Sequence, residues 1–197
     1  MIDTKLRGKF QPTFDIMAVK LVKIQLRPNV ITWIAFGVGI LASVSVAIEW
    51  MIPSILLLWL SGLLDVLDGT VARLTRSSSR GGAYMDLILD RMVEAAYILG
   101  LAYRFPQGYY AYLLFYVAVI FNFTTFIVAG ALFQNNGAKS MHYDVGIAER
   151  TETFLVFTLL ALFPTNIYLI LMIFNAVIFI TGMVRFKRVL AYSKSLD

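Results

Sequence analysis

The chain reads Asp65-Val-Leu-Asp-Gly-Thr-Val-Ala-Arg73 and, after eight further residues, Gly82-Ala-Tyr-Met-Asp-Leu-Ile-Leu-Asp90. Asp65 and Asp68 are three residues apart and therefore share one face of a helix. Asp86 and Asp90 are four residues apart and share a face in the same way. Two otherwise apolar stretches thus carry two pairs of carboxylates.

The composition around this stretch is that of a membrane protein. Of the 197 residues, 59% are hydrophobic and 15% are charged, and the mean hydropathy is +0.77. A soluble domain has about 45–50% apolar and about 25% charged residues, so a soluble enzyme is disfavoured and a disordered chain is excluded. The absence of cysteine excludes disulfides and thiolate metal sites, and a single histidine cannot form a multi-histidine zinc site.

Apolar stretches of about 20 residues predict membrane crossings. We predict an all-α integral membrane fold with six transmembrane helices: Val30–Ile48, Met51–Leu74, Gly81–Tyr103, Tyr109–Leu132, Gly146–Phe163 and Ile167–Met183. Residues 15–27 alternate apolar and basic side chains and predict an N-terminal juxtamembrane amphipathic helix on the membrane surface. We therefore expect an interfacial segment at residues 1–29, the six-helix domain at 30–184 and a basic tail at 185–197.

Basic residues predict the orientation. Fifteen of the 17 lysines and arginines fall in the N-terminal segment, the loops after the second and fourth spans, and the C-terminus. Lysine and arginine concentrate on the cytoplasmic side, so both termini and the carboxylates are expected there, in the cell membrane if the source is bacterial. In so apolar a chain the net charge of +5 indicates this orientation rather than a nucleic-acid partner.

The carboxylates are expected to meet. The second and third spans run antiparallel through a polar turn around Ser77-Ser78-Ser79, which predicts that both pairs lie at similar depth near the cytoplasmic boundary. Each carboxylate costs about 2.5–3.5 kcal/mol at a helix centre, and mutual repulsion adds to this. Carboxylate oxygens suit hard divalent cations, so the cluster predicts one or two ions of Mg²⁺ or a similar metal.

The pattern Asp-x2-Asp-Gly-x2-Ala-Arg-x8-Gly-x3-Asp-x3-Asp resembles the signature of the CDP-alcohol phosphotransferase family. Every fixed position is met, by Asp65, Asp68, Gly69, Ala72, Arg73, Gly82, Asp86 and Asp90. Six spans and an N-terminal surface helix are also similar to that family, as is the segment Pro28-Asn29-Val30-Ile31-Thr32 that begins span one.

The resemblance implies a reaction in which an alcohol hydroxyl attacks a CDP-linked donor, usually CDP-diacylglycerol, and CMP leaves. It implies Mg²⁺ or Mn²⁺, membrane lipids as partners, and a homodimer. By the family pattern the metal ligands are Asp65, Asp68, Asp86 and Asp90, and Asp90 is also the catalytic base. The donor would contact Asp68, Gly69, Ala72, Arg73, Gly82, Asn29 and Thr32.

The acceptor side is less defined. Residues 146–153 look like the start of span five in phosphatidylinositol-phosphate synthases, but Thr153 stands where those enzymes carry a second arginine. They also carry a lysine near the end of span four, which residues 126–131 lack. A neutral or zwitterionic small polar alcohol is therefore favoured over a phosphorylated one. The candidate acceptor residues are Arg150, Glu94 and Lys139.

Several alternatives stay open at this point. A CDP-amino-alcohol donor with diacylglycerol as acceptor fits the same signature. A cation transporter is another possibility, because intramembrane carboxylates also mark ion paths, although the charges here gather on one side. Arg150 could form a loop ion pair, Glu94 could pair with Arg91, and Asn122 is expected to hydrogen-bond between helices.

Overall fold

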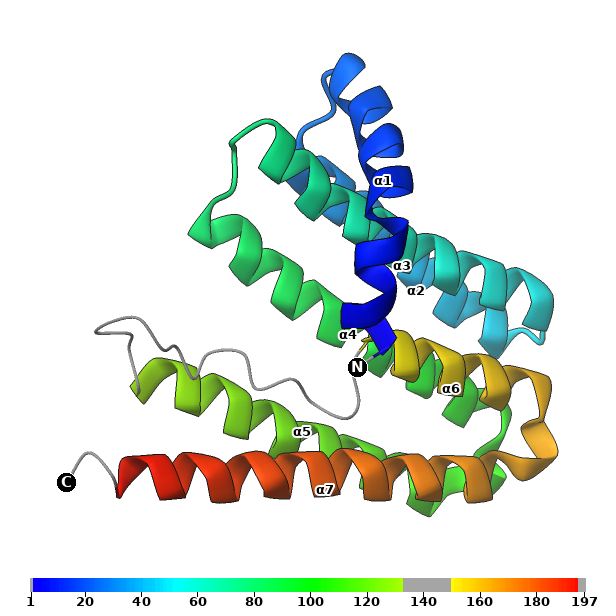
Figure 1. The fold of residues 1–197 in the computed structure, drawn as a ribbon. Helices are drawn as coiled ribbons and strands as arrows, with labels where there is room; N and C mark the ends of the chain where they lie inside the picture. The colour runs from blue at the N-terminus through cyan, green and yellow to red at the C-terminus, as the bar shows by residue number, and fades with distance from the viewer. Residues whose placement is uncertain (1, 133–149, 195–197) are drawn as a thin grey trace. The chain divides into compact units, whose positions relative to one another are not determined.

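The structure, a computed structural model, describes residues 2–132 and 150–194, and no strand occurs within those ranges (Figure 1). The helical elements in chain order are α1 (Ile2–Lys23), α2 (Pro28–Ala47), α3 (Met51–Leu74), α4 (Arg80–Arg104), η1 (Pro106–Gly108), α5 (Tyr109–Leu132), α6 (Arg150–Leu162), η2 (Pro164–Asn166) and α7 (Ile167–Ser193). The all-α expectation is confirmed for the described residues.

The chain divides into two compact units, which we describe separately. Residues 4–106 form a unit that contains α2, α3, α4 and most of α1. Residues 107–197, together with residues 1–3, form a second unit that contains α5, α6 and α7. All of the signature residues fall in the unit of residues 4–106.

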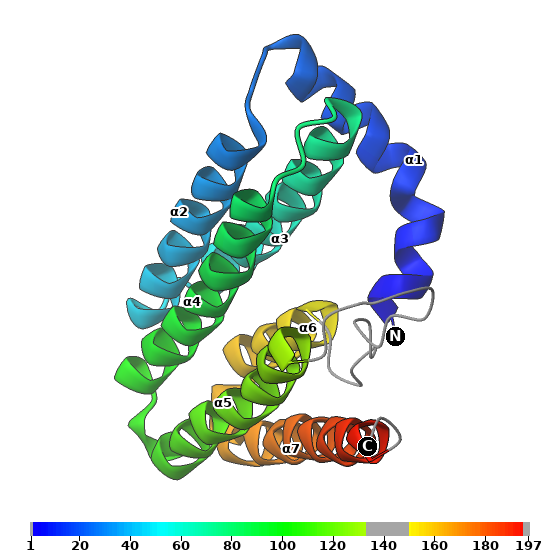
Figure 2. The ribbon, with the colours of Figure 1, turned by 90° about the vertical axis from the view of Figure 1, so that its left-hand side faces the viewer.

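Helix α2 is the common packing partner in this unit. The close backbone contacts of the unit are between α2 and α3 and between α2 and α4, and the three helices run side by side (Figure 2). Two glycines permit the close approach of α2 and α4: a Cβ on Gly100 would lie 2.4 Å from the backbone oxygen of Ser43, and one on Gly39 would lie 2.6 Å from Val93. Glycine is required at Gly100 because a backbone atom cannot move aside as a side chain can.

Three helices of this unit end in the same way. After α1, α2 and α3 the chain places Gln25, Glu49 and Arg76 in the left-handed region, with φ of 56°, 66° and 53°. Each is followed by a backbone N–H that bonds back to the last helical turn: Leu26 to Leu21, Trp50 to Ser45, and Ser77 to Ala72. These are Schellman-type ends, which turn the chain sharply without glycine.

Helix α1 packs against α2 and α3. Ala18, Ile31, Leu67 and Val71 form a buried cluster that Phe14, Met17 and Leu21 flank. Ile16 and Val19 are exposed together with the basic Lys20 and Lys23. The helix is longer at its N-terminus than the predicted surface segment and ends at Lys23 rather than Arg27, because the left-handed Gln25 stops it.

In the second unit, α5 and α7 lie side by side and α6 contacts α7 (Figure 1). The buried Phe115 ring of α5 lies 6.0 Å from Phe157 of α6 and 6.4 Å from Phe174 of α7, measured between ring centroids. The Asn175 amide of α7 donates a 2.8 Å hydrogen bond to the backbone oxygen of Ala111.

Within the described residues, four segments are long and apolar enough to cross a membrane: Pro28–Ala47, Met51–Leu74, Pro106–Leu132 and Pro164–Ser193. They make the chain an integral membrane protein. The predicted third span coincides with α4, which is long enough but carries Asp86, Asp90, Arg91 and Glu94. The predicted fifth span corresponds to α6, of which 13 residues are described, and Gly146 lies outside the described residues. The six-span arrangement stays a prediction.

Replacing Gly100 by alanine is expected to destabilise the packing of α2 against α4. The added Cβ would overlap the Ser43 carbonyl oxygen, and such overpacking costs about 1–3 kcal/mol. A fall of about 2–12 °C in the apparent melting temperature in detergent should follow, at about 2–4 °C for each kcal/mol in a chain of this length. Gly37→Ala is the control, since nothing lies within 4 Å of a Cβ at Gly37. Equal melting temperatures for the two variants would contradict the argument.

Candidate active site

The first carboxylate pair and Asp86 come together in space. Asp65 and Asp68 of α3 and Asp86 of α4 each offer an oxygen, and these three oxygens all lie within 4.8 Å of one another. Asp68 is 6% exposed, and the other two residues are half-buried. The predicted convergence of the two stretches is therefore confirmed for three of the four carboxylates.

Helix α2 fixes the position of Asp68. The Thr32 hydroxyl lies 2.6 Å from Asp68 Oδ2 and 3.1 Å from the backbone oxygen of Pro28. Thr32 is itself buried, with 6% exposure. A hydroxyl that donates to a carboxylate makes a strong, charge-assisted bond, so α2 holds the carboxylate in one orientation. Three helices thus build this part of the site.

Asp90 and Glu94 follow Asp86 along α4. Asp90 is half-buried and is not one of the three clustered carboxylates. Glu94 is buried and forms an ion pair with Arg91, with 2.6 Å between Oε1 and Nη2. Of the roles considered for Glu94, pairing with Arg91 is the one this geometry supports, and an acceptor role stays a prediction.

A cavity of about 190 Å³ lies beside the carboxylates. Eight of the residues predicted for the site line it: Asn29, Thr32, Asp68, Gly69, Ala72, Arg73, Gly82 and Asp86. The loop residues Ser77, Ser78 and Ser79 also line it. The sequence treated these serines only as a turn. Their position in the sequence, between Arg73 and Gly82 of the signature, is the feature that could have predicted that they line the cavity.

Glycine keeps one wall of this cavity open. A Cβ on Gly82 would lie 3.1 Å from Ser79 Oγ and 3.3 Å from Asn29 Oδ1, so any side chain there would occupy the cavity. Ser79 caps α4 by accepting a 3.0 Å hydrogen bond from the Gly82 amide. Arg73 is exposed, and its Nη2 donates a 2.9 Å bond to Thr70 Oγ1, which orients the guanidinium on α3.

The donor set fits a hard divalent cation. At about 5 Å and an effective dielectric constant of about 20, each pair of carboxylates repels by about 3 kcal/mol. The summed repulsion of three such pairs is comparable to the whole free energy of unfolding of a domain, about 5–15 kcal/mol. A bound cation offsets this cost. Oxygen-only ligands are those that Mg²⁺ and Mn²⁺ prefer.

A known protein family matches the part of the chain that contains this site. The sequence pattern of the CDP-alcohol phosphatidyltransferase family matches residues 25–184. The chain belongs to the CDP-alcohol phosphatidyltransferase family. This membership identifies an enzyme and removes the cation transporter from consideration. The family's pattern covers the whole signature.

Two relatives match this chain over most of their length. The inner membrane protein YnjF of Escherichia coli is 31% identical over 193 residues, which are 94% of this chain and 93% of that protein. The archaetidylinositol phosphate synthase of Pyrococcus horikoshii is 27% identical over 160 residues, 81% of this chain and 82% of the relative.

Solved structures share the fold. The Mycobacterium tuberculosis phosphatidylinositol phosphate synthase with CDP-DAG bound superposes with a TM-score of 0.75 at 20% identity, covering 89% of this chain and 92% of that one. The same enzyme in complex with manganese and citrate gives a TM-score of 0.75 at 21% identity, covering 90% of this chain and 88% of that one.

The other two acceptor candidates do not belong to the unit of residues 4–106. Arg150 begins α6 in the second unit, where its guanidinium carbon lies 5.3 Å from the Phe154 ring centroid, and its acceptor role stays a prediction. Lys139 lies outside the described residues. The sequence did not single out Arg185, a buried residue of α7 whose Nη1 donates to Asn122 of α5 over 2.8 Å. The expected interhelical bond of Asn122 is confirmed.

Mn²⁺ should stabilise the protein through the carboxylate cluster. At a hundredfold excess over the dissociation constant, binding adds about 2.7 kcal/mol, or about 5–10 °C in apparent melting temperature. Asp86→Asn should lose most of this shift. Asp15→Asn on α1, outside the cluster, should retain it. The same shift in wild type and in Asp86→Asn would show that the metal binds elsewhere.

Proposed function

We propose that the protein transfers a phosphatidyl group from CDP-diacylglycerol to the hydroxyl of a small polar alcohol and releases CMP. The observation that carries this proposal is the cavity whose lining combines the clustered Asp68 and Asp86 with Arg73 and the two signature glycines. The M. tuberculosis relative of the same fold was solved with CDP-DAG bound. These supports are independent, since one is local geometry and the other is overall fold.

The donor's diphosphate would lie between Arg73 and the carboxylates. Arg73 supplies the positive charge at the cavity wall, and a guanidinium suits phosphate oxygens. Gly69 and Gly82, with the small Ala72, leave the backbone accessible, so the nucleotide can approach α3 and α4 closely. Asn29 and Thr32 would contact the donor from α2. These assignments are our proposal for the donor-binding residues.

Two divalent ions, Mg²⁺ or Mn²⁺, would be held by Asp65, Asp68, Asp86 and Asp90 and would neutralise charge on the diphosphate. Thr32 keeps Asp68 oriented for this role through its 2.6 Å contact. Loss of a group that orients a metal ligand commonly lowers metal affinity by about 10–100-fold. Thr32 thus belongs to the proposed site through Asp68.

Asp90 is the proposed catalytic base. It lies one helical turn from Asp86 on α4, so it faces the same side as the clustered carboxylates. In the proposed step the acceptor hydroxyl oxygen bonds to the phosphorus distal to cytidine, and the bond from that phosphorus to the bridging oxygen breaks. CMP leaves with the electron pair of this bond, and Asp90 accepts the hydroxyl proton.

The proposed acceptor is a neutral or zwitterionic alcohol. Thr153, where phosphatidylinositol-phosphate synthases carry a second arginine, is buried on α6. Two arginines, Arg150 and the buried Arg185, are nevertheless present in the same unit. Relatives named as inositol phosphate lipid synthases make inositol phosphate the first phosphorylated acceptor to compare.

We propose six membrane crossings with both termini and the site on the cytoplasmic side. Helix α4 packs along α2, which is itself a candidate span. The 25 residues of α4 extend about 37 Å, which is long enough to cross a membrane. Its charged residues account for its low hydropathy. The division into residues 1–29, 30–184 and 185–197 is part of this proposal, with α7 continuing through Ser193. The homodimer stays a prediction.

Asp90→Asn should abolish turnover while donor binding stays measurable. Loss of a general base lowers the rate by about 10²–10⁴-fold. CMP release from CDP-diacylglycerol measures turnover, and competition by CMP measures donor binding. Glu49→Gln is the control, because Glu49 is exposed and pairs with Arg104 away from the signature. Near-normal CMP release from Asp90→Asn would remove Asp90 from the base role.

A panel of acceptors tests the substrate. The purified protein is supplied with CDP-diacylglycerol, Mg²⁺ and, in turn, glycerol 3-phosphate, inositol phosphate, inositol, serine or ethanolamine. Turnover should be faster with an unphosphorylated acceptor, because the second arginine is replaced by Thr153. Faster turnover with inositol phosphate would contradict the proposed acceptor class. No CMP release with any acceptor would contradict the proposed reaction.

A further inference from the structure

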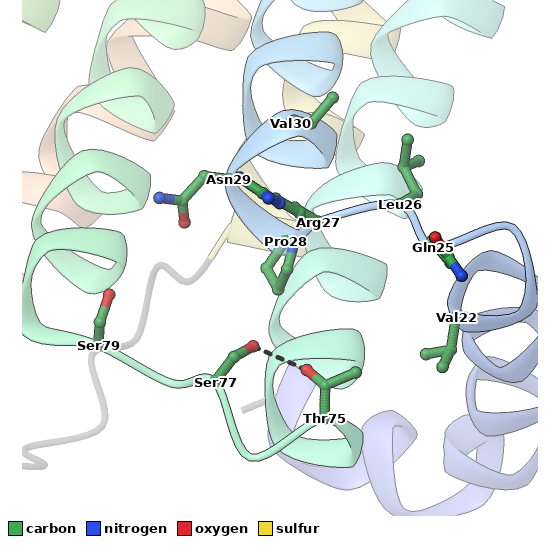
Figure 3. Close-up of a pocket in the computed structure, with 10 residues that line it drawn as sticks. All are labelled: Val22, Gln25, Leu26, Arg27, Pro28, Asn29, Val30, Thr75, Ser77 and Ser79. Atoms are coloured by element: carbon green, nitrogen blue, oxygen red, sulfur yellow. Dashed lines mark hydrogen bonds between the residues drawn. The ribbon is translucent and has the colours of Figure 1, made fainter.

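A second, larger cavity borders the N-terminus of α2 and adjoins the site cavity. Its volume is about 550 Å³, within the range of about 300–1,000 Å³ typical of ligand sites. Figure 3 shows the turn between α1 and α2 facing the loop between α3 and α4, with Pro28 between them. The two cavities share Pro28, Asn29, Ser77 and Ser79 as a common wall.

The lining of this cavity is amphipathic. Val22, Leu26 and Val30 are apolar, and the facing loop presents the hydroxyls of Thr75 and Ser77, which lie 2.7 Å apart (Figure 3). The left-handed residues Gln25 and Arg76 bend the two connections at this point. A lining that combines apolar side chains with hydroxyls suits a ligand that has both an apolar and a polar part.

The charge around the cavity is positive. Arg27 lines the cavity. Lys20 and Lys23 are exposed on the last turn of α1, shortly before the lining residues 25–30 in the sequence. The cavity also lies at a membrane boundary, because the candidate span Pro28–Ala47 begins at its wall. Basic residues next to a span attract anionic lipids by about 1 kcal/mol each.

We propose that this cavity binds the headgroup of an anionic phospholipid, with Arg27 contacting the phosphate and the hydroxyl oxygens of Thr75 and Ser77 forming hydrogen bonds with the headgroup. The acyl chains would follow the apolar side chains of Val22 and Val30 toward the membrane. The proposal is separate from the donor site, because Arg27 and Thr75 line only the larger cavity. Because the two cavities share a wall, a donor bound in the smaller cavity would change the affinity of the larger cavity for the lipid.

Native mass spectrometry of the full chain in neutral detergent tests this with dioleoyl phosphatidylglycerol as the probe. One bound lipid is expected, with affinity about fivefold weaker in Arg27→Gln and also reduced in Thr75→Val. Arg80→Gln is the matched control, since Arg80 is exposed and lines neither cavity. Dioleoyl phosphatidylcholine should bind more weakly than phosphatidylglycerol to the wild type.

Three results would overturn the proposal. Equal affinity in Arg27→Gln and wild type would show that this cavity is not the site. Equal weakening by Arg80→Gln would indicate diffuse attraction to the basic surface. Displacement of the lipid by millimolar inorganic phosphate would show that the free anion suffices. Because the readout is binding, none of these results depends on the proposed transfer reaction.

Discussion

Repulsion among carboxylates held in an apolar helix unit is the constraint on which the rest of the structure depends. Asp65, Asp68 and Asp86 place oxygens within 4.8 Å of one another, at a cost of about 3 kcal/mol for each pair. An arrangement of this cost is maintained only where the surrounding helices are firmly packed. The glycines, the buried hydroxyl of Thr32 and the sharp helix ends all serve that packing.

Helix α2 is central to this packing because it contacts both helices that bear the carboxylates. Gly100 lets its backbone approach α4, and Thr32 joins it to Asp68 of α3. The N-terminus of α2 also borders both cavities, since Pro28 and Asn29 line both. The proposed metal ligands, the proposed donor cavity and the proposed lipid pocket therefore all depend on one helix that contributes none of the carboxylates.

Much of the candidate site was predictable, because its residues repeat at helical spacing within two adjoining segments. Six of the eight predicted residues that line the cavity come from these two segments, and Asn29 and Thr32 come from the start of α2. The sequence was less informative where a role depends on a distant partner. It left Glu94 between an acceptor role and pairing with Arg91, and it did not single out Arg185, whose partner Asn122 lies on another helix. Hydropathy was also ambiguous for α4, because the charged residues inside it, Asp86, Asp90, Arg91 and Glu94, make it less apolar than the four candidate spans.

The sequence by itself determined the helices, the pairing of aspartates on common faces, and the family, because the period of a helix fixes which residues along it share a side. Only the tertiary structure decided that α3 and α4 both pack on α2, that Thr32 bonds to Asp68, and that α1 buries Ala18 against α3. These features depend on which surfaces fit closely together, and no spacing along a single segment encodes that fit.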